Sequence, residues 1–322
     1  MISQNLHSRR EFNRLASAAL VSAGMGSIPI NLSAETKKYI VPTSPRNVNT
    51  EQTVKALASN VPAGKGEYVP HFIDAANAVH FKRYGKSYQD YVVSLAEVPD
   101  NVKRFASNPL EVLIEDEFAR NTSEGIIGGY FEHANSPKTP HRVHLDSSLT
   151  PSTLFFSLFH ELSHLFIGLN EPLAHVYTHR SISDAVALFP SLLMEKDEQC
   201  PLTQLMLFYR GKIQATKQSL TFSMQPEHLA YLTLLHSNIN TGTVIDVGNA
   251  FDFLARQGTP MYSQILSKAL PLFNSNQDFA PDIIKDFATK TEQYILRQNP
   301  SMPADKMALL RRKMEKIASM PN

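Results

Sequence analysis

The chain has 322 residues, with 31 Lys and Arg against 30 Asp and Glu, and a net charge of +1 at pH 7. This length allows a sizeable core in one or two domains. The near-neutral charge gives no indication of a nucleic-acid partner or a strongly acidic one. The single cysteine, Cys200, cannot form an internal disulfide. With no second cysteine beside it, Cys200 is expected as a buried apolar side chain rather than a metal ligand.

The first residues follow a pattern typical of an export signal. Ser8-Arg9-Arg10-Glu11-Phe12 matches the twin-arginine pattern, a mildly apolar run follows at 15–28, and cleavage is plausible after Ala34. We therefore expect residues 1–34 to be a signal peptide that sends the folded protein to the periplasm or otherwise out of the cytoplasm. No run of 18 apolar residues follows, so no membrane span is expected after signal removal.

The next segments are expected to be a linker and then helices. Residues 35–65 contain scattered Pro, Ser, Thr and Asn, which predicts a linker with one short helix at 50–58. Helical periodicity predicts further helices at 69–84, 88–96, 100–106 and 109–120. The acidic residues of the last segment are expected on its solvated face: Glu111, Glu115, Asp116 and Glu117.

Two strands are expected after these helices. Residues 125–133 alternate weakly in hydropathy, residues 135–140 have turn composition, and residues 141–145 complete a hairpin. His141 and His144 on the second strand are candidate neighbours of a functional site.

The most specific motif is His160-Glu161-Leu162-Ser163-His164. It lies in a helical pattern that begins at Thr150 and Pro151 and ends at Gly168. Because residues four apart lie one above the other on a helix, His160 and His164 can bind one metal ion through two imidazole nitrogens. Zinc suits such ligands, and Glu161, about 100° round the helix, can reach a zinc-bound water as a general base.

A second helix is expected from Glu171 to about residue 196, antiparallel to the first because the connection is short. Its first turn would face His164, which makes Glu171 the candidate third ligand. His175 and His179 continue the Glu171 face, as groups that support the ligands or as an alternative ligand. A zinc hydrolase also needs a group that stabilises the developing oxyanion. The candidates for that role are Tyr130, Tyr177, His179, His228 and Tyr231.

These motifs resemble the ImmA/IrrE-like peptidases, which are minimal gluzincins. That family has H-E-L-x-H followed by E-x-x-A-[N/D] on the next helix, and Glu171-Pro-Leu-Ala174-His175 is similar to the second motif. Residues 125–130 and 142–146 look like the two strands that precede the family's zinc helix. The resemblance covers about residues 125–194. It implies a zincin-like core with Zn²⁺ bound by His160, His164 and Glu171, and Glu161 as base.

The chain departs from the family pattern at His175, which replaces Asn or Asp, and the family often has longer spacing before its Glu. Asp184, Glu195 and His175 therefore stay open as alternative third ligands. In zinc peptidases of this class, a strand beside the zinc helix binds substrate by strand addition, in which an exposed sheet edge pairs with an extended peptide.

The remaining residues predict helices only, at 201–220, 226–237, 244–257, 260–273, 280–297 and 302–318. We therefore expect a mainly α protein with a small antiparallel β-sheet, of the α+β class. The expected division is a signal peptide at 1–34, a linker at 35–65, a zincin-like catalytic region at 66–200 and a helical C-terminal region at 201–322.

The sequence predicts an exported zinc peptidase that hydrolyses a peptide or protein. Two alternatives stay open: a non-catalytic helical binding protein with a structural metal site, and a zinc hydrolase of non-peptide amides. A structural zinc site has four closed ligands and needs no base, so Glu161 beside only three evident ligands favours an enzyme.

Overall fold

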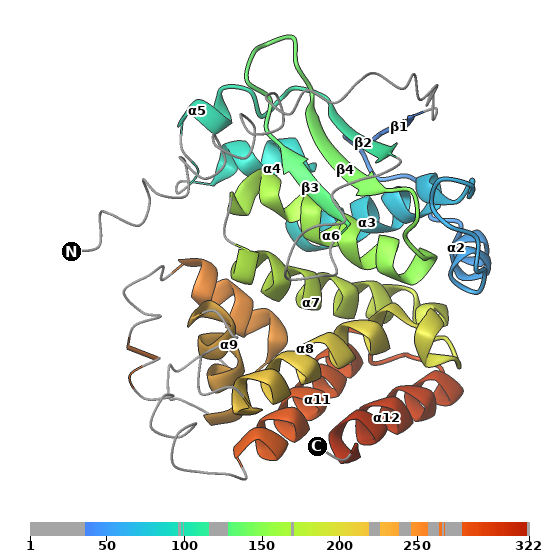
Figure 1. Ribbon diagram of the computed structural model, residues 1–322, viewed down its shortest axis with the longest axis vertical. Helices are drawn as coiled ribbons and strands as arrows, with labels where there is room; N and C mark the ends of the chain where they lie inside the picture. The colour runs from blue at the N-terminus through green and yellow to red at the C-terminus, as the bar shows by residue number, and fades with distance from the viewer. Residues whose placement is uncertain are drawn as a thin grey trace, which may run out of the picture. The chain divides into compact units, whose positions relative to one another are not determined.

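A four-stranded mixed sheet packs against the helix that carries His160 and His164 (Figure 1). Its strands are β1 (Lys37–Ile40), β2 (Leu110–Glu115), β3 (Gly129–Glu132) and β4 (His141–Asp146), in the order β1-β2-β4-β3. β3 and β4 are antiparallel, as expected for the hairpin. β2 runs parallel to β4 and β1 antiparallel to β2, so the sheet is mixed rather than antiparallel throughout.

The computed structural model describes residues 36–95, 98, 100–115, 128–168, 171–218, 226–237, 246–256, 264–265, 267 and 279–320. The expected signal peptide therefore lies outside the described residues. The part of the chain from Thr36 onward is one compact unit. Within it, α6 (Pro151–Ile167) and α7 (Glu171–Leu188) pack against α8 (Pro201–Gln218), so the expected catalytic and C-terminal regions are in contact.

The prediction of a helix at 109–120 was wrong for residues 110–115, which form β2. Leu110, Val112 and Ile114 alternate into the core and are at most 2% exposed. β2 has a strand on each side, so backbone pairing and burial of this period-2 pattern outweigh the helix propensity of its Leu and Glu residues. Glu111 is buried rather than solvated, and it pairs with Lys38 at 2.9 Å and Arg142 at 3.6 Å.

The segment expected as a linker also contributes to the sheet. Residues 37–40 form β1 at one end of the strand order, and the next residue, Val41, is 1% exposed. The short helix expected there is present as α2 (Thr50–Leu57), with the Asn49 side chain accepting a hydrogen bond from the backbone N–H of Gln52.

The other helices follow the chain in order: α3 (Val69–Tyr84), α4 (Tyr88–Ser94), α5 (Asp100–Lys103), α9 (Pro226–Ser237), α11 (Phe279–Gln298) and α12 (Ala304–Ser319), with short 3₁₀ turns η1 (Pro190–Leu192) and η2 (Asp197–Gln199). Residues 247–256 are also helical. Of the helix expected at 260–273, most residues lie outside the described part. α7 ends at Leu188 rather than near 196, because Phe189 precedes Pro190 and that position disfavours helical backbone.

α6 lies at the centre of the core. Thr150 caps its first turn, Pro151 opens it, and Gly168 ends it with a positive φ of 68°. Phe155 and Phe159 on α6 are fully buried, and Phe155 meets Phe72 of α3 edge to face at 5.1 Å. The described chain is therefore mainly helical with a small mixed sheet, as the expected α+β class requires. Among the described helices, none has the length and apolar character needed to cross a bilayer.

Candidate metal centre

His160, His164 and Glu171 come together where the last turns of α6 meet the first turn of α7. Nε2 of His160 lies 3.3 Å from Nε2 of His164 and 3.0 Å from Oε2 of Glu171. Nε2 of His164 lies 3.6 Å from Oε1 of Glu171. Of the described residues, these three form the group of His, Cys, Asp and Glu side chains that could hold a metal ion.

The spacing of these atoms fits a zinc ion. Zinc bonds to imidazole nitrogen and carboxylate oxygen at about 2.0–2.2 Å, so two ligand atoms of a tetrahedral site lie about 3.3–3.6 Å apart. The two imidazole Nε2 atoms, 3.3 Å apart, fall in that range, and the 3.0 and 3.6 Å separations join His160 and His164 to the two different oxygens of Glu171. Two imidazoles and one carboxylate are also the ligand set of a catalytic zinc site with a fourth position for water.

A hydrogen bond orients the His164 imidazole toward the other two side chains of the group. Nδ1–H of His164 donates to the carbonyl of Gly168 at 2.5 Å, which leaves the lone pair of Nε2 directed at His160 and Glu171. Burial lowers the pKa of His164, and His160 lowers it further, so this imidazole is neutral, as a metal ligand must be. Both rings are buried, whereas the Glu171 side chain is 52% exposed, so the centre opens to solvent on the α7 side.

Glu161 is buried beside this group without joining it. Its Oε2 lies 4.0 Å from Nε2 of His164, and the residue is 3% exposed. Desolvation raises the pKa of Glu161 well above its ordinary value, and the charge of Glu171 raises it further. A dication bound to the neighbouring group would favour the ionised carboxylate, which is the form that accepts a proton.

Gly129 on β3 allows the sheet to approach this carboxylate. A Cβ at Gly129 would lie 2.8 Å from Cδ2 of Leu145, 2.9 Å from the carbonyl oxygen of His144 and 3.1 Å from Cγ of Glu161. The sequence shows a Gly128-Gly129 pair inside an expected strand, which is a signal of close backbone approach that sequence reasoning did not use.

The alternative third ligands lie elsewhere or outside the group. The Asp184 carboxylate pairs with Arg83 at 3.1 Å, and the Glu195 carboxylate pairs with Arg312 at 3.0 Å. His175 does lie beside the centre, with its ring 4.4 Å from that of His160, but it does not join the metal-capable group.

Most candidates for the oxyanion role serve the packing of the helices. His179 is fully buried, accepts a hydrogen bond from the Tyr231 hydroxyl at 2.5 Å, and contacts Thr291 at 3.0 Å. Tyr177 is 2% exposed and lies 3.3 Å from Nδ1 of His80. The His228 side chain lies outside the described residues.

Tyr130 is 45% exposed on β3, next in the chain to Gly129. Its ring stacks on His144 at 4.1 Å. Successive side chains of a strand point to opposite faces, so Tyr130 lies with His144 on the face opposite the one on which Gly129 approaches Glu161, and it points away from the candidate centre.

The two strand histidines hold the sheet together. His141 accepts from the backbone N–H of Ala134 at 3.1 Å and donates to the carbonyl of Phe105 at 2.8 Å, so both ring nitrogens are used. His144 contacts the carboxylates of Glu115 at 3.0 Å and Glu132 at 3.4 Å on the opposite face of β4.

The sequence did not predict the aromatic environment of His160 and His175. Phe156 of α6 lies 6.4 Å from His160, and Phe208 of α8 lies 5.0 Å from His175, both measured between ring centroids. The structure therefore supplies two imidazoles, an exposed carboxylate and a buried carboxylate at one place, against an apolar wall. Comparison of the chain with protein-family models, curated proteins and solved structures gave no match.

Proposed function

We propose that this protein is a zinc-dependent peptidase whose metal is held by His160, His164 and Glu171. The observation that carries the proposal is the grouping of two imidazole nitrogens 3.3 Å apart, about one edge of a tetrahedral zinc site, with one oxygen of Glu171 lying 3.0 Å from His160 and the other 3.6 Å from His164. The buried Glu161 carboxylate next to this group favours a catalytic centre over a structural one, because a structural zinc site needs no base.

Each residue has a distinct role in the proposed reaction. The two imidazoles and the Glu171 carboxylate would hold a zinc ion, which would supply a Lewis acid that polarises a carbonyl and acidifies water. Glu161 takes the proton of the attacking water on its carboxylate and passes it to the leaving amine. Its burial, which strengthens charge interactions, keeps this proton transfer away from bulk water.

The position of β3 supports an extended peptide as the substrate. β3 ends the strand order, so in the described part of the chain its second edge has no strand partner. Gly129 on this strand lies against Glu161, so a peptide paired with the open edge would run beside the base. This arrangement favours a peptide or protein over a small amide as the substrate. We therefore also propose that the sheet and α6 form a zincin-like core.

The proposed location is the periplasm or another compartment reached by the twin-arginine route. This part of the proposal depends on residues 1–34, which lie outside the described residues. Enzymes exported by that route leave the cytoplasm folded, so the zinc would be bound before export.

Peptide hydrolysis by the purified mature chain tests the proposed activity. Wild-type protein is incubated with a mixed peptide library, with and without a zinc chelator, and products are identified by mass spectrometry. We expect cleavage that the chelator abolishes and added zinc restores. Glu161→Gln should lower the rate by about 10²–10⁴-fold, the usual contribution of a general base.

The negative outcomes separate the alternatives. Cleavage that survives both the chelator and Glu161→Gln would contradict the proposal. A zinc-loaded protein that cleaves no peptide but hydrolyses a cell-wall amide would identify the centre as a non-peptide hydrolase. A zinc-loaded protein with neither activity would support the binding-protein alternative.

A further inference from the structure

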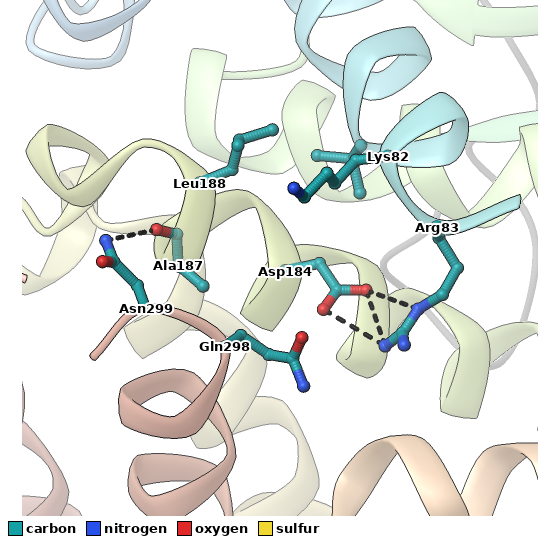
Figure 2. Close-up of a pocket in the computed structure, with 8 residues that line it drawn as sticks. Lys82, Arg83, Asp184, Ala187, Leu188, Gln298 and Asn299 are labelled. Carbon is teal, nitrogen blue, oxygen red and sulfur yellow. Dashed lines mark hydrogen bonds and ion pairs between the residues drawn. The ribbon is translucent and has the colours of Figure 1, made fainter. Parts of the chain in front are cut away.

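A cavity with both polar and apolar lining residues lies between α3, the end of α7 and the end of α11 (Figure 2). Its volume is about 300 Å³, at the lower end of the range for small-molecule sites. Asp184 lines it and lies 13 residues after Glu171 on α7, which is about 20 Å along the helix axis. The cavity is therefore separate from the candidate metal centre.

The negative charge in this cavity is already neutralised. The Asp184 carboxylate lies 3.1 Å from the Arg83 guanidinium and accepts a hydrogen bond from the Tyr294 hydroxyl at 2.6 Å. Figure 2 shows the Arg83 guanidinium directed at both oxygens of Asp184. With Asp184 paired to Arg83, no carboxylate among the residues that line the cavity is left to neutralise a second positive charge.

Lys82 brings a second positive charge to the cavity. It lines the cavity from α3 as an exposed residue, and among the described residues its ammonium group has no hydrogen-bond or ion-pair partner in the protein. In Figure 2 it extends across the cavity from the side opposite Gln298 and Asn299. The Asn299 amide donates to the carbonyl of Ala187 at 2.8 Å, so Gln298 is the amide left to contact a ligand.

An aliphatic wall completes the lining. Val79, Ala187 and Leu188 all border the cavity, and Leu188 is 37% exposed at its edge. One uncompensated ammonium, one amide and an aliphatic wall match a molecule with a single negative charge and a short hydrocarbon part. A phosphate dianion would leave one charge unpaired and the apolar wall unused.

We propose that this cavity binds a small organic carboxylate with a short aliphatic chain. The carboxylate pairs with Lys82 and accepts a hydrogen bond from the Gln298 amide. The aliphatic part packs against Val79 and Leu188. This proposal does not depend on the metal centre.

Titration calorimetry with isovalerate, acetate and inorganic phosphate tests this site on the mature chain with a metal chelator present. We expect one isovalerate per chain, bound about tenfold or more tightly than acetate, because each buried methylene contributes about fourfold to affinity. Phosphate should bind more weakly than isovalerate. Absence of zinc in the experiment makes its outcome independent of peptidase activity.

Two variants and a control locate the ligand. Lys82→Gln should weaken isovalerate binding about tenfold or more, because a charge-assisted hydrogen bond is lost. Leu188→Ser should remove the preference for isovalerate over acetate while acetate binding persists. Lys55→Gln, at an exposed lysine of α2 away from the cavity, should bind as wild type. The proposal is overturned if isovalerate does not saturate, if phosphate binds more tightly, or if Lys82→Gln binds as wild type does.

Discussion

At the scale of single residues, Gly129 connects the sheet to the chemistry of the site. Its missing side chain is what lets β3 lie against Glu161 and the backbone of β4. A glycine that is needed because it has no side chain is difficult to recognise from one sequence. Glycine inside a strand can equally indicate a strand that is locally weakened.

We predict that Gly129→Ala displaces β3 from α6. The new Cβ would lie 2.9 Å from a backbone oxygen, which cannot move aside as a flexible side chain can. The expected cost is about 1–3 kcal/mol in the free energy of unfolding, with loss of activity, because overpacking strains the backbone. Denaturant unfolding and the peptide assay measure the two effects.

Gly211 on α8 provides the matched control. A Cβ there meets nothing within 4 Å, and the position is exposed in a helix. Gly211→Ala should raise stability by about 0.5–1 kcal/mol and leave activity unchanged. Equal behaviour of the two variants would show that the close approach of β3 does not matter.

The grouping of His160, His164 and Glu171 was predictable from the sequence because their spacing is local. His160 and His164 are four residues apart on one helix, and Glu171 lies just beyond a short connection. The distinction between Glu171 and its competitors was not predictable. Asp184 and Glu195 lie outside the group because they pair with Arg83 and Arg312, which lie about a hundred residues away in the chain.

At the scale of elements, α6 is held by aromatic packing rather than by its polar face. Phe155 is fully buried between Phe72 of α3 and Phe159 of its own helix. Because α6 carries both histidines and Glu161, this packing also fixes the site geometry.

We predict that Phe155→Ala costs about 3–5 kcal/mol of stability, the range for truncating a buried Phe. The variant should also bind zinc more weakly, since the supporting helix is no longer fixed. Val93→Ala on α4, at a residue 56% exposed, should change stability by less than about 0.5 kcal/mol. Denaturant unfolding curves give both changes in the free energy of unfolding, provided that the variants have the same dependence on denaturant concentration. A smaller loss of stability in Phe155→Ala than in Val93→Ala would contradict this account of the core.

Long helices were predicted from the sequence far better than the sheet was. α3, α6 and α11 lie close to their expected positions because each has many residues of one period. β2 has six residues that also suit a helix, and its state is decided by partners 30 residues later in the chain. β1 was missed for the same reason, because its pairing with β2 is not visible in residues 37–40 alone.

At the scale of the whole molecule, buried histidines make stability depend on pH. His80 and His179 are each at most 1% exposed, and burial lowers the pKa of each to about 3. In the unfolded chain they titrate near their ordinary pKa of about 6.5. Their folded pKa is depressed, so protonation favours the unfolded state, and stability falls as the pH drops below about 6.5 toward 3.

We predict that each of these histidines lowers the free energy of unfolding by about 2 kcal/mol when the pH falls from 7 to 5. The interval from the ordinary pKa of about 6.5 down to pH 5 is roughly 1.5 pH units, and each unit contributes about 1.36 kcal/mol. His179→Gln should be less stable than wild type at pH 7, since its contacts with Tyr231 and Thr291 are disturbed. Its stability should nevertheless fall by about 2 kcal/mol less on acidification. Urea unfolding at both pH values measures this difference, and an unchanged difference would refute the assignment of His179 as a neutral buried group.

The most direct test of the zinc centre is the metal content of the purified mature chain and three variants. We predict about one zinc per chain in wild type, in Glu161→Gln and in the control Glu195→Ala, and loss of zinc in Glu171→Ala. Wild-type protein that binds no zinc at saturating metal would contradict the zinc centre outright. Zinc retained by Glu171→Ala would show that the third ligand is not the carboxylate that lies 3.0 Å from His160.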